Sequence, residues 1–261
     1  MSEQTEKHSD APENDEALPL ITHLVELRNR MLRAVICVIA IFLSLYYFAN
    51  DLYTYLSEPL RAFLPEGATM IATGVASPFL TPFKLTFVAS IFIAMPFILY
   101  QAWAFVSPAL FDKERKLAIP LLVSSVILFY LGMTFAYFVV FPLVFGFFTS
   151  AGPEGVAIMT DISIYLDFVL KMFFAFGFAF EIPIAIIILV AVGATNCASL
   201  SEKRPYIVIG CFVVGMLLTP PDVISQTLLA VPMWLLFEVG LLFAKMVEKP
   251  AEEPELESPQ S

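Results

Sequence analysis

Long apolar runs dominate the chain, and they limit the folds that it can adopt. Hydrophobic residues make up 59% of its 261 residues, and charged residues only 15%. Because a helix of ~20 apolar residues crosses ~30 Å of hydrocarbon, such runs predict membrane-spanning helices and exclude a water-soluble monomer. We therefore expect an all-α integral membrane protein with six transmembrane helices. The expected spans are 30–49, 83–105, 117–146, 164–192, 206–218 and 223–243.

The last two expected spans are short, and a proline-rich turn separates them. The run 206–218 has only 13 residues, which make ~20 Å of helix. Pro220 and Pro221 follow closely and cannot continue a helix, so they indicate a tight turn. Two interpretations stay open here, namely two short spans that thin the bilayer locally or a re-entrant hairpin. We favour the two short spans, because a bilayer can thin around a short helix.

The positions of Lys and Arg predict the orientation of the chain. Of its 14 basic residues, 11 fall on one side of the six-span arrangement, and the positive-inside rule makes that side cytoplasmic. Both termini should then be cytoplasmic. The net charge of −10 arises mostly at the two ends, which carry six acids against one Lys and five acids against one Lys. We expect disordered acidic tails at 1–19 and 246–261, around a membrane domain at 20–245.

Glu181 lies in an apolar stretch that contains no other charged residue. A carboxylate near the bilayer centre costs ~2.5–3.5 kcal/mol, so such a residue marks a candidate functional site. Three roles remain open: a structural hydrogen bond between helices, a contact with cargo or a partner inside the membrane, or a proton relay. Gln226 is a possible neutral partner. The third role would suit a proton-coupled secondary transporter of a small solute, which is the alternative function.

Two further glutamates should lie near the cytoplasmic surface. Glu26 belongs to an amphipathic helix that leads into the first span, and Arg30 follows it at the i,i+4 spacing of a helical ion pair. Glu114 lies in the loop after the second span among three basic residues. Spacing alone favours an ordinary ion pair for Glu26 and a solvated acid for Glu114.

Neither an enzyme nor a metal protein is indicated. The three cysteines have no CxxC spacing, and the two histidines, His8 and His23, are 15 residues apart. The chain contains no HExxH, P-loop, GxGxxG or GxSxG motif. We therefore expect no catalytic residue, no metal and no cofactor. The lipid bilayer is expected as a partner of the chain, and a nucleic acid is not. The residues alone leave a transporter and a receptor scaffold equally open.

Several stretches resemble the TatC family, the multispanning subunit of the twin-arginine protein translocase. They occur in the family's order and cover roughly residues 20–245. The stretches are Leu20-Ile-Thr-His-Leu-Val-Glu-Leu-Arg28, Ala76-Ser-Pro-Phe79 with Lys84, Ala102-Trp-Ala-Phe105 to Glu114-Arg115, Phe138-Val-Val-Phe-Pro142, Phe180-Glu-Ile-Pro183, Lys203-Arg-Pro-Tyr206, and Gly215-Met-Leu-Leu-Thr-Pro-Pro-Asp-Val-Ile-Ser-Gln226.

The resemblance implies a receptor for twin-arginine signal peptides and the core of a translocase. Such a translocase exports folded proteins across the bacterial inner membrane and draws on the proton-motive force. The implied fold is six helices in a concave, cupped arrangement with both termini cytoplasmic. The implied partners are TatB-like and TatA-like single-span subunits and further copies of the chain in a multimeric receptor complex. No nucleotide or cofactor is implied.

The resemblance also implies roles for individual residues. Signal-peptide binding is implied for Glu26, Glu114, Phe105 and Arg28. An intramembrane polar site is implied for Glu181, with Gln226 as its neighbour. Shape-holding or partner-contact roles near the exported side are implied for Pro59, Tyr137 and Asp222.

Overall fold

The structure is a computed structural model that describes residues 17–61, 70–106, 118–150, 159–219 and 223–247. The described chain is helical, and its one pair of bridged backbone segments is an isolated contact between Ile71 and Asp161. The helices are α1 (Ala17–Leu45), η1 (Tyr46–Phe48), α2 (Ala49–Arg61), α3 (Ser77–Val106), α4 (Ala118–Phe135), η4 (Ala136–Val140), α5 (Phe141–Ser150), α6 (Ile162–Ala179), α7 (Ile182–Ala191), α8 (Cys197–Glu202), α9 (Arg204–Leu218) and α10 (Val223–Val247).

Five helical stretches within the described residues are long and apolar enough to cross a membrane, and α9 is a shorter apolar helix. This confirms the all-α, multispanning fold class. The prediction that the last two spans are both short is wrong for the second of them, because α10 has 25 residues and only α9, with 15, is short. The sequence boundary missed four residues at the end of α10, where Ala244 is buried and Lys245 occupies the last turn.

The helix boundaries also differ from the expected spans near the first turns. The amphipathic lead-in and the first span form one continuous helix, α1, which starts at Ala17. The stretch 50–82, which separates the first two expected spans, contains most of α2 and the first residues of α3. Pro82 does not stop α3, because it lies in the second turn of the helix and removes only one early hydrogen bond.

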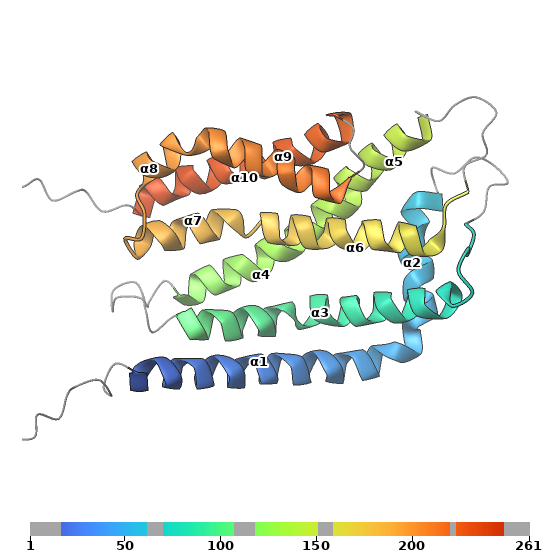
Figure 1. The fold of residues 1–261 in the computed structure, drawn as a ribbon, viewed down its shortest axis with the longest axis horizontal. Helices are drawn as coiled ribbons and strands as arrows, with labels where there is room; N and C mark the ends of the chain where they lie inside the picture. The colour runs from blue at the N-terminus through green and yellow to red at the C-terminus, as the bar shows by residue number, and fades with distance from the viewer. Residues whose placement is uncertain (1–16, 62–69, 107–117, 151–158, 220–222, 248–261) are drawn as a thin grey trace, which may run out of the picture.

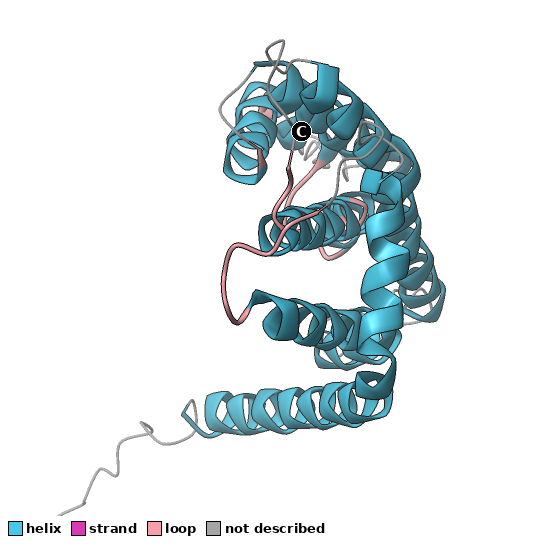
Figure 2. Ribbon diagram, turned by 90° about the vertical axis from the view of Figure 1, so that its right-hand side faces the viewer, coloured by secondary structure: helices cyan, strands magenta, loops and turns pink. Residues whose placement is uncertain are grey.

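The helices run alongside one another, with α2 crossing them at one end (Figure 1). The first residues of α1 and the last residues of α10 lie at the same end of the bundle, which we call the terminal end (Figure 1). The end of α3 and the start of α4 are also there. In the view at right angles, the helices follow an arc that is open on one side (Figure 2). Because α1 starts and α10 ends at the terminal end, the chain passes from one end of the bundle to the other an even number of times (Figure 1).

Two long apolar runs are interrupted where prolines disturb the hydrogen-bond ladder. The fourth run divides into α6 and α7 around Phe180 and Glu181, and Pro183, near the start of α7, has no N–H to continue the ladder. The third run has a π-helical turn, η4, just before Pro142. Both interruptions leave the helices roughly in line (Figure 1). The first sets Glu181 at the break between α6 and α7.

Glycines permit the closest helix crossings. A Cβ on Gly132 of α4 would lie 2.3 Å from the carbonyl oxygen of Phe176 in α6, and a Cβ on Gly177 would lie 2.7 Å from the Phe129 ring. A Cβ on Gly240 of α10 would lie 2.7 Å from the Cα of Pro183 in α7. Small residues at such crossings let helix backbones pack closely in a membrane, where dispersion contacts replace the hydrophobic effect. Aromatic side chains of α3 to α6 fill the core beside these crossings.

Candidate functional site

The first candidate site lies at the terminal end, where α1 packs against α3. Glu26 Oε1 accepts hydrogen bonds from Arg30 Nε at 2.9 Å and from Arg30 Nη2 at 2.5 Å. Arg30 Nη1 also reaches Gln101 Oε1 of α3 at 3.5 Å. The Arg30 side chain is 20% exposed and the Glu26 side chain 38% exposed, so the pair is accessible from solvent. The helical ion pair expected from the spacing is therefore present, and it is tied to a second helix.

Of the other residues expected in this site, Phe105 and Arg28 are described and Glu114 is not. Phe105 is half-buried and lies next to the last residue of α3, one turn beyond Gln101. Arg28 is exposed and donates to the side chain of its neighbour Asn29, so it does not contact Glu26. Glu114 lies outside the described residues. Gln101 was missed by the sequence reasoning, although a polar side chain near the end of an apolar run is a detectable signal.

The second candidate site is Glu181, at the break between α6 and α7. Its Oε2 accepts a hydrogen bond from Ser125 Oγ of α4, and its buried Oε1 has no hydrogen-bond partner in the described structure. The side chain therefore keeps one acceptor atom available inside the bundle. An unsatisfied carboxylate oxygen in such surroundings is costly, and a polar group on another molecule could relieve that cost.

The structure does not bring Glu181 and Gln226 together. Gln226 Nε2 donates to the carbonyl oxygen of Phe212 at 2.8 Å, and its backbone and side chain pack on Gly215. Gln226 thus joins α10 to α9 near their shared turn. The neighbour of Glu181 is Ser125, which the sequence reasoning missed because a serine in an apolar run carries little signal by itself.

The residues expected near the exported side are described only in part. Tyr137 belongs to η4, is half-buried, and packs against the rings of Phe138 and Phe141 at centroid distances of 4.9 and 6.1 Å. Pro59 lies in α2, but its side chain is outside the described part. Asp222 also falls outside the described residues.

Asp161, the N-cap residue of α6, is a further polar residue that the sequence reasoning missed. Its Oδ2 accepts from the Thr73 hydroxyl at 2.5 Å and from the Thr73 backbone N–H at 2.8 Å, while its Oδ1 caps the start of α6. These hydrogen bonds, with those to Thr73 as the largest cause, hold the pKa of Asp161 well below its usual range. The carboxylate ties the segment at residues 71–73 to the first turn of α6.

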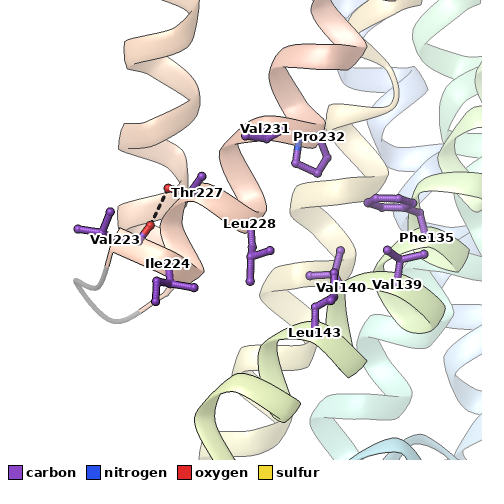
Figure 3. A pocket seen from close by; sticks show the side chains of 10 residues that line it. All are labelled: Phe135, Val139, Val140, Leu143, Val223, Ile224, Thr227, Leu228, Val231 and Pro232. Atoms are coloured by element: carbon purple, nitrogen blue, oxygen red, sulfur yellow. Dashed lines mark hydrogen bonds between the residues drawn. The ribbon is translucent and has the colours of Figure 1, made fainter. Parts of the chain in front are cut away.

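An apolar groove lies between η4 and α5 on one side and α10 on the other (Figure 3). It has a volume of about 460 Å³. The hydroxyl of Thr227 donates to the carbonyl oxygen of Val223 within α10, so it offers no free donor to a ligand. The groove therefore has the chemistry of a contact with lipid chains or with an apolar helix. Its lining residues are Phe135, Val139, Val140, Leu143, Val223, Ile224, Thr227, Leu228, Val231 and Pro232.

No cluster of three or more His, Cys, Asp or Glu residues that could hold a metal ion is found within the described ranges. The two candidate sites are instead single carboxylates on helices. The first accepts hydrogen bonds from the guanidinium of Arg30, and the second accepts one from the hydroxyl of Ser125.

Comparison with known proteins identifies the family. The model of the family "Sec-independent protein translocase protein (TatC)" matches residues 22–232. The chain belongs to the TatC family. The TatC proteins of Azotobacter chroococcum mcd 1 and of Escherichia coli K12 are each 60% identical to it, over 93% and 88% of this chain and 95% and 90% of their own lengths.

A solved TatC structure is similar in fold as well. The crystal structure described as the twin-arginine translocase receptor TatC superimposes with a TM-score of 0.78 at 35% sequence identity, over 86% of this chain and 99% of that one. The chain is thus the TatC component of a Sec-independent twin-arginine protein translocase, a transport protein and not an enzyme. Because the chain belongs to the TatC family, the alternative function of a small-solute transporter is no longer supported.

Proposed function

We propose that this TatC chain is the receptor for twin-arginine signal peptides and the core through which folded proteins are exported. The observation that carries the proposal is the Glu26 carboxylate, which lies at the terminal end of α1 and already binds a guanidinium, that of Arg30. A carboxylate held in this way can accept the two parallel N–H groups of an incoming arginine. Lys lacks this planar fork, so the site favours Arg over Lys.

In this proposal Glu26 and Glu114 each receive one arginine of the signal peptide. Phe105, next to the end of α3, offers an apolar contact beside them, and Arg28 flanks Glu26 on the exposed side of α1. An incoming arginine either replaces Arg30 on Glu26 or shares the carboxylate with it. Gln101 is then available to hold the displaced Arg30 guanidinium, which it already reaches.

The rest of the molecule fits the same function. We place the terminal end in the cytoplasm and the opposite end outside, with six spans in a cupped arrangement in the bacterial inner membrane.

Glu181 offers a polar contact inside the cup to cargo or to a partner helix. TatB-like and TatA-like single-span subunits and further TatC copies are the partners, and the proton-motive force drives export. We assign shape-holding or partner contacts to Pro59, Tyr137, Asp222 and Gln226, and the role of tails to the acidic segments that precede α1 and follow α10.

A binding experiment with two peptides tests the receptor assignment. A twin-arginine signal peptide and its Lys-Lys counterpart are titrated against the purified chain and against Glu26→Gln and Glu114→Gln. Each hydrogen bond to a charged group is worth ~1.5–3 kcal/mol, so each variant should bind the twin-arginine peptide about tenfold or more weakly. Binding of the Lys-Lys peptide should be weak throughout.

Two control variants separate recognition from general damage. Glu238 pairs with Arg204 at the same end of the bundle, at 2.8 Å, so Glu238→Gln breaks a matched ion pair and should leave peptide binding unchanged. Arg30→Gln frees the Glu26 carboxylate and should keep or strengthen binding. Unchanged twin-arginine binding in both Glu26→Gln and Glu114→Gln would overturn the assignment.

A further inference from the structure

Arg30 occupies Glu26 in a way that uses only half of the carboxylate. Both of its donors, Nε at 2.9 Å and Nη2 at 2.5 Å, bind the same oxygen, Oε1. The other oxygen, Oε2, accepts no hydrogen bond from any residue that the structure describes. An arginine that arrives from another chain can use both oxygens, which is the strongest arrangement for a guanidinium and a carboxylate. The resident contact is therefore weaker than the one that an incoming arginine can make.

Gln101 of α3 offers the Arg30 side chain a second position. Gln101 is only 6% exposed, and its Oε1 lies 3.5 Å from Arg30 Nη1, at the outer limit of a hydrogen bond. A shift of about half an ångström toward α3 would turn this contact into an ordinary hydrogen bond. The guanidinium can therefore leave Glu26 without losing every acceptor, which would be costly in a half-buried position.

We propose that Arg30 is a built-in competitor of the signal-peptide arginine, and that Gln101 receives Arg30 when the peptide binds. This inference rests on the proposed receptor function and adds the regulation of the same site. At rest, Arg30 neutralises Glu26. An incoming arginine takes both carboxylate oxygens and displaces Arg30 toward Gln101. Because the return of Arg30 opposes the bound state, the peptide is held reversibly and can be released to a later step of export.

Titration of the purified full-length chain with a twin-arginine signal peptide gives the sign of the effect. Arg30→Gln should bind the peptide about fivefold more tightly, near the upper end of the range for exposed ion pairs, because the Arg30 side chain is only 20% exposed. Arg33→Gln is the matched control. Arg33 is an exposed arginine of the same helix without a described contact to Glu26, and its loss should change binding less than about twofold. Weaker or unchanged binding in Arg30→Gln would overturn the proposal.

The Glu26→Gln background separates competition from general charge repulsion. Without the carboxylate, Arg30 has nothing to occupy, so adding Arg30→Gln to Glu26→Gln should bring no gain in peptide binding. An equal gain in both backgrounds is an effect of charge alone and would overturn the proposal. The receptor function fails separately, when Glu26→Gln and Glu114→Gln both bind as the parent chain does. Weak binding by Glu26→Gln together with no gain in Arg30→Gln rejects the competition and keeps the receptor.

Gln101→Leu tests where the displaced guanidinium goes. In the parent chain it removes the second position of Arg30, so the peptide should bind about fivefold more weakly, which is the contribution of one hydrogen bond. In the Arg30→Gln background it should have no effect, because no guanidinium needs that position. Equal weakening in both backgrounds is what a structural role of Gln101 gives, and it would overturn the assignment of Gln101. The Arg30→Gln titration decides the competition even where Gln101→Leu does not fold.

Discussion

Glu181 has one carboxylate oxygen bonded to Ser125 and the other without a partner in the described structure. If Glu181 Oε1 binds a polar group on another molecule, its loss should impair complex assembly or transport and leave peptide binding intact. Glu181→Ala should insert and bind the twin-arginine peptide within about twofold of the parent chain. Loss of a charge-assisted hydrogen bond should lower complex assembly or transport about tenfold or more. Peptide binding and export of a reporter protein, measured on the same variants, check this expectation.

Conservative variants distinguish the roles of the two oxygens. Glu181→Gln keeps an acceptor for the Ser125 hydroxyl and should be milder than Glu181→Ala. Ser125→Ala removes only the internal bond. A loss of peptide binding in Glu181→Ala equal to that of Glu26→Gln would contradict the separation of the two sites.

Asp161 predicts a dependence of stability on pH. Its pKa is lowered in the folded chain by the hydrogen bonds from Thr73, so its contribution is complete above the ordinary carboxylate pKa of ~3.9 and is lost as the pH falls below that value. Asp161→Asn should lower the thermal midpoint by about 2–4 °C at pH 7. The gap from the parent chain should shrink as the pH falls from about 4. A constant gap down to pH 2 would contradict this assignment.

At the scale of elements, the crossing of α4 and α6 depends on the absence of a side chain. Gly132→Ala places a Cβ 2.3 Å from a backbone oxygen of α6, which cannot move without the helix. We expect a loss of about 1–3 kcal/mol in stability, typical of overpacking. Gly210→Ala in α9 is the matched control, since a Cβ there meets nothing within 4 Å. Thermal unfolding in detergent compares the two, and equal midpoints would show that α4 and α6 do not cross this closely.

At the scale of the whole molecule, cysteine labelling in intact cells tests the proposed orientation of the chain in the membrane. Val75 lies just before α3, at the opposite end from the termini, and Glu202 is the last residue of α8, at the terminal end (Figure 1). Both residues are exposed, so each can be replaced by Cys for labelling. In a chain without Cys37, Cys197 and Cys211, a membrane-impermeant maleimide should label Val75→Cys in intact cells. It should label Glu202→Cys only after permeabilisation. The reverse pattern would invert the proposed topology.

The sequence predicts those features of this chain that depend on local chemistry. Runs of apolar residues predict the helices, Pro183 predicts a weakened ladder beside Glu181, and the i,i+4 spacing predicts the ion pair of Glu26 with Arg30. The amphipathic lead-in to the first span was predicted as a helix, and α1 contains it. The last four residues of α10 were missed, because Lys245 interrupts the apolar run there. The assignment of signal-peptide residues stays a prediction.

Contacts between distant segments could not be predicted from one sequence. Ser125 and Glu181 are 56 residues apart, Thr73 and Asp161 are 88 apart, and Arg30 and Gln101 are 71 apart. Each contact depends on how whole helices pack, which local patterns do not encode. Gln226 shows the converse, because its polarity suggested a partner for Glu181 while the fold turns it toward Phe212.

The position of α1 has a consequence for biosynthesis. Only 6% of its most apolar stretch is buried, and its main neighbour is α3. A helix whose surface is almost wholly suited to lipid is stable in the bilayer by itself. As the ribosome produces the chain, α1 can therefore lie in the membrane before α3 is made and packs against it. The protein would then assemble from its N-terminus as a sequence of lateral associations in the plane of the membrane.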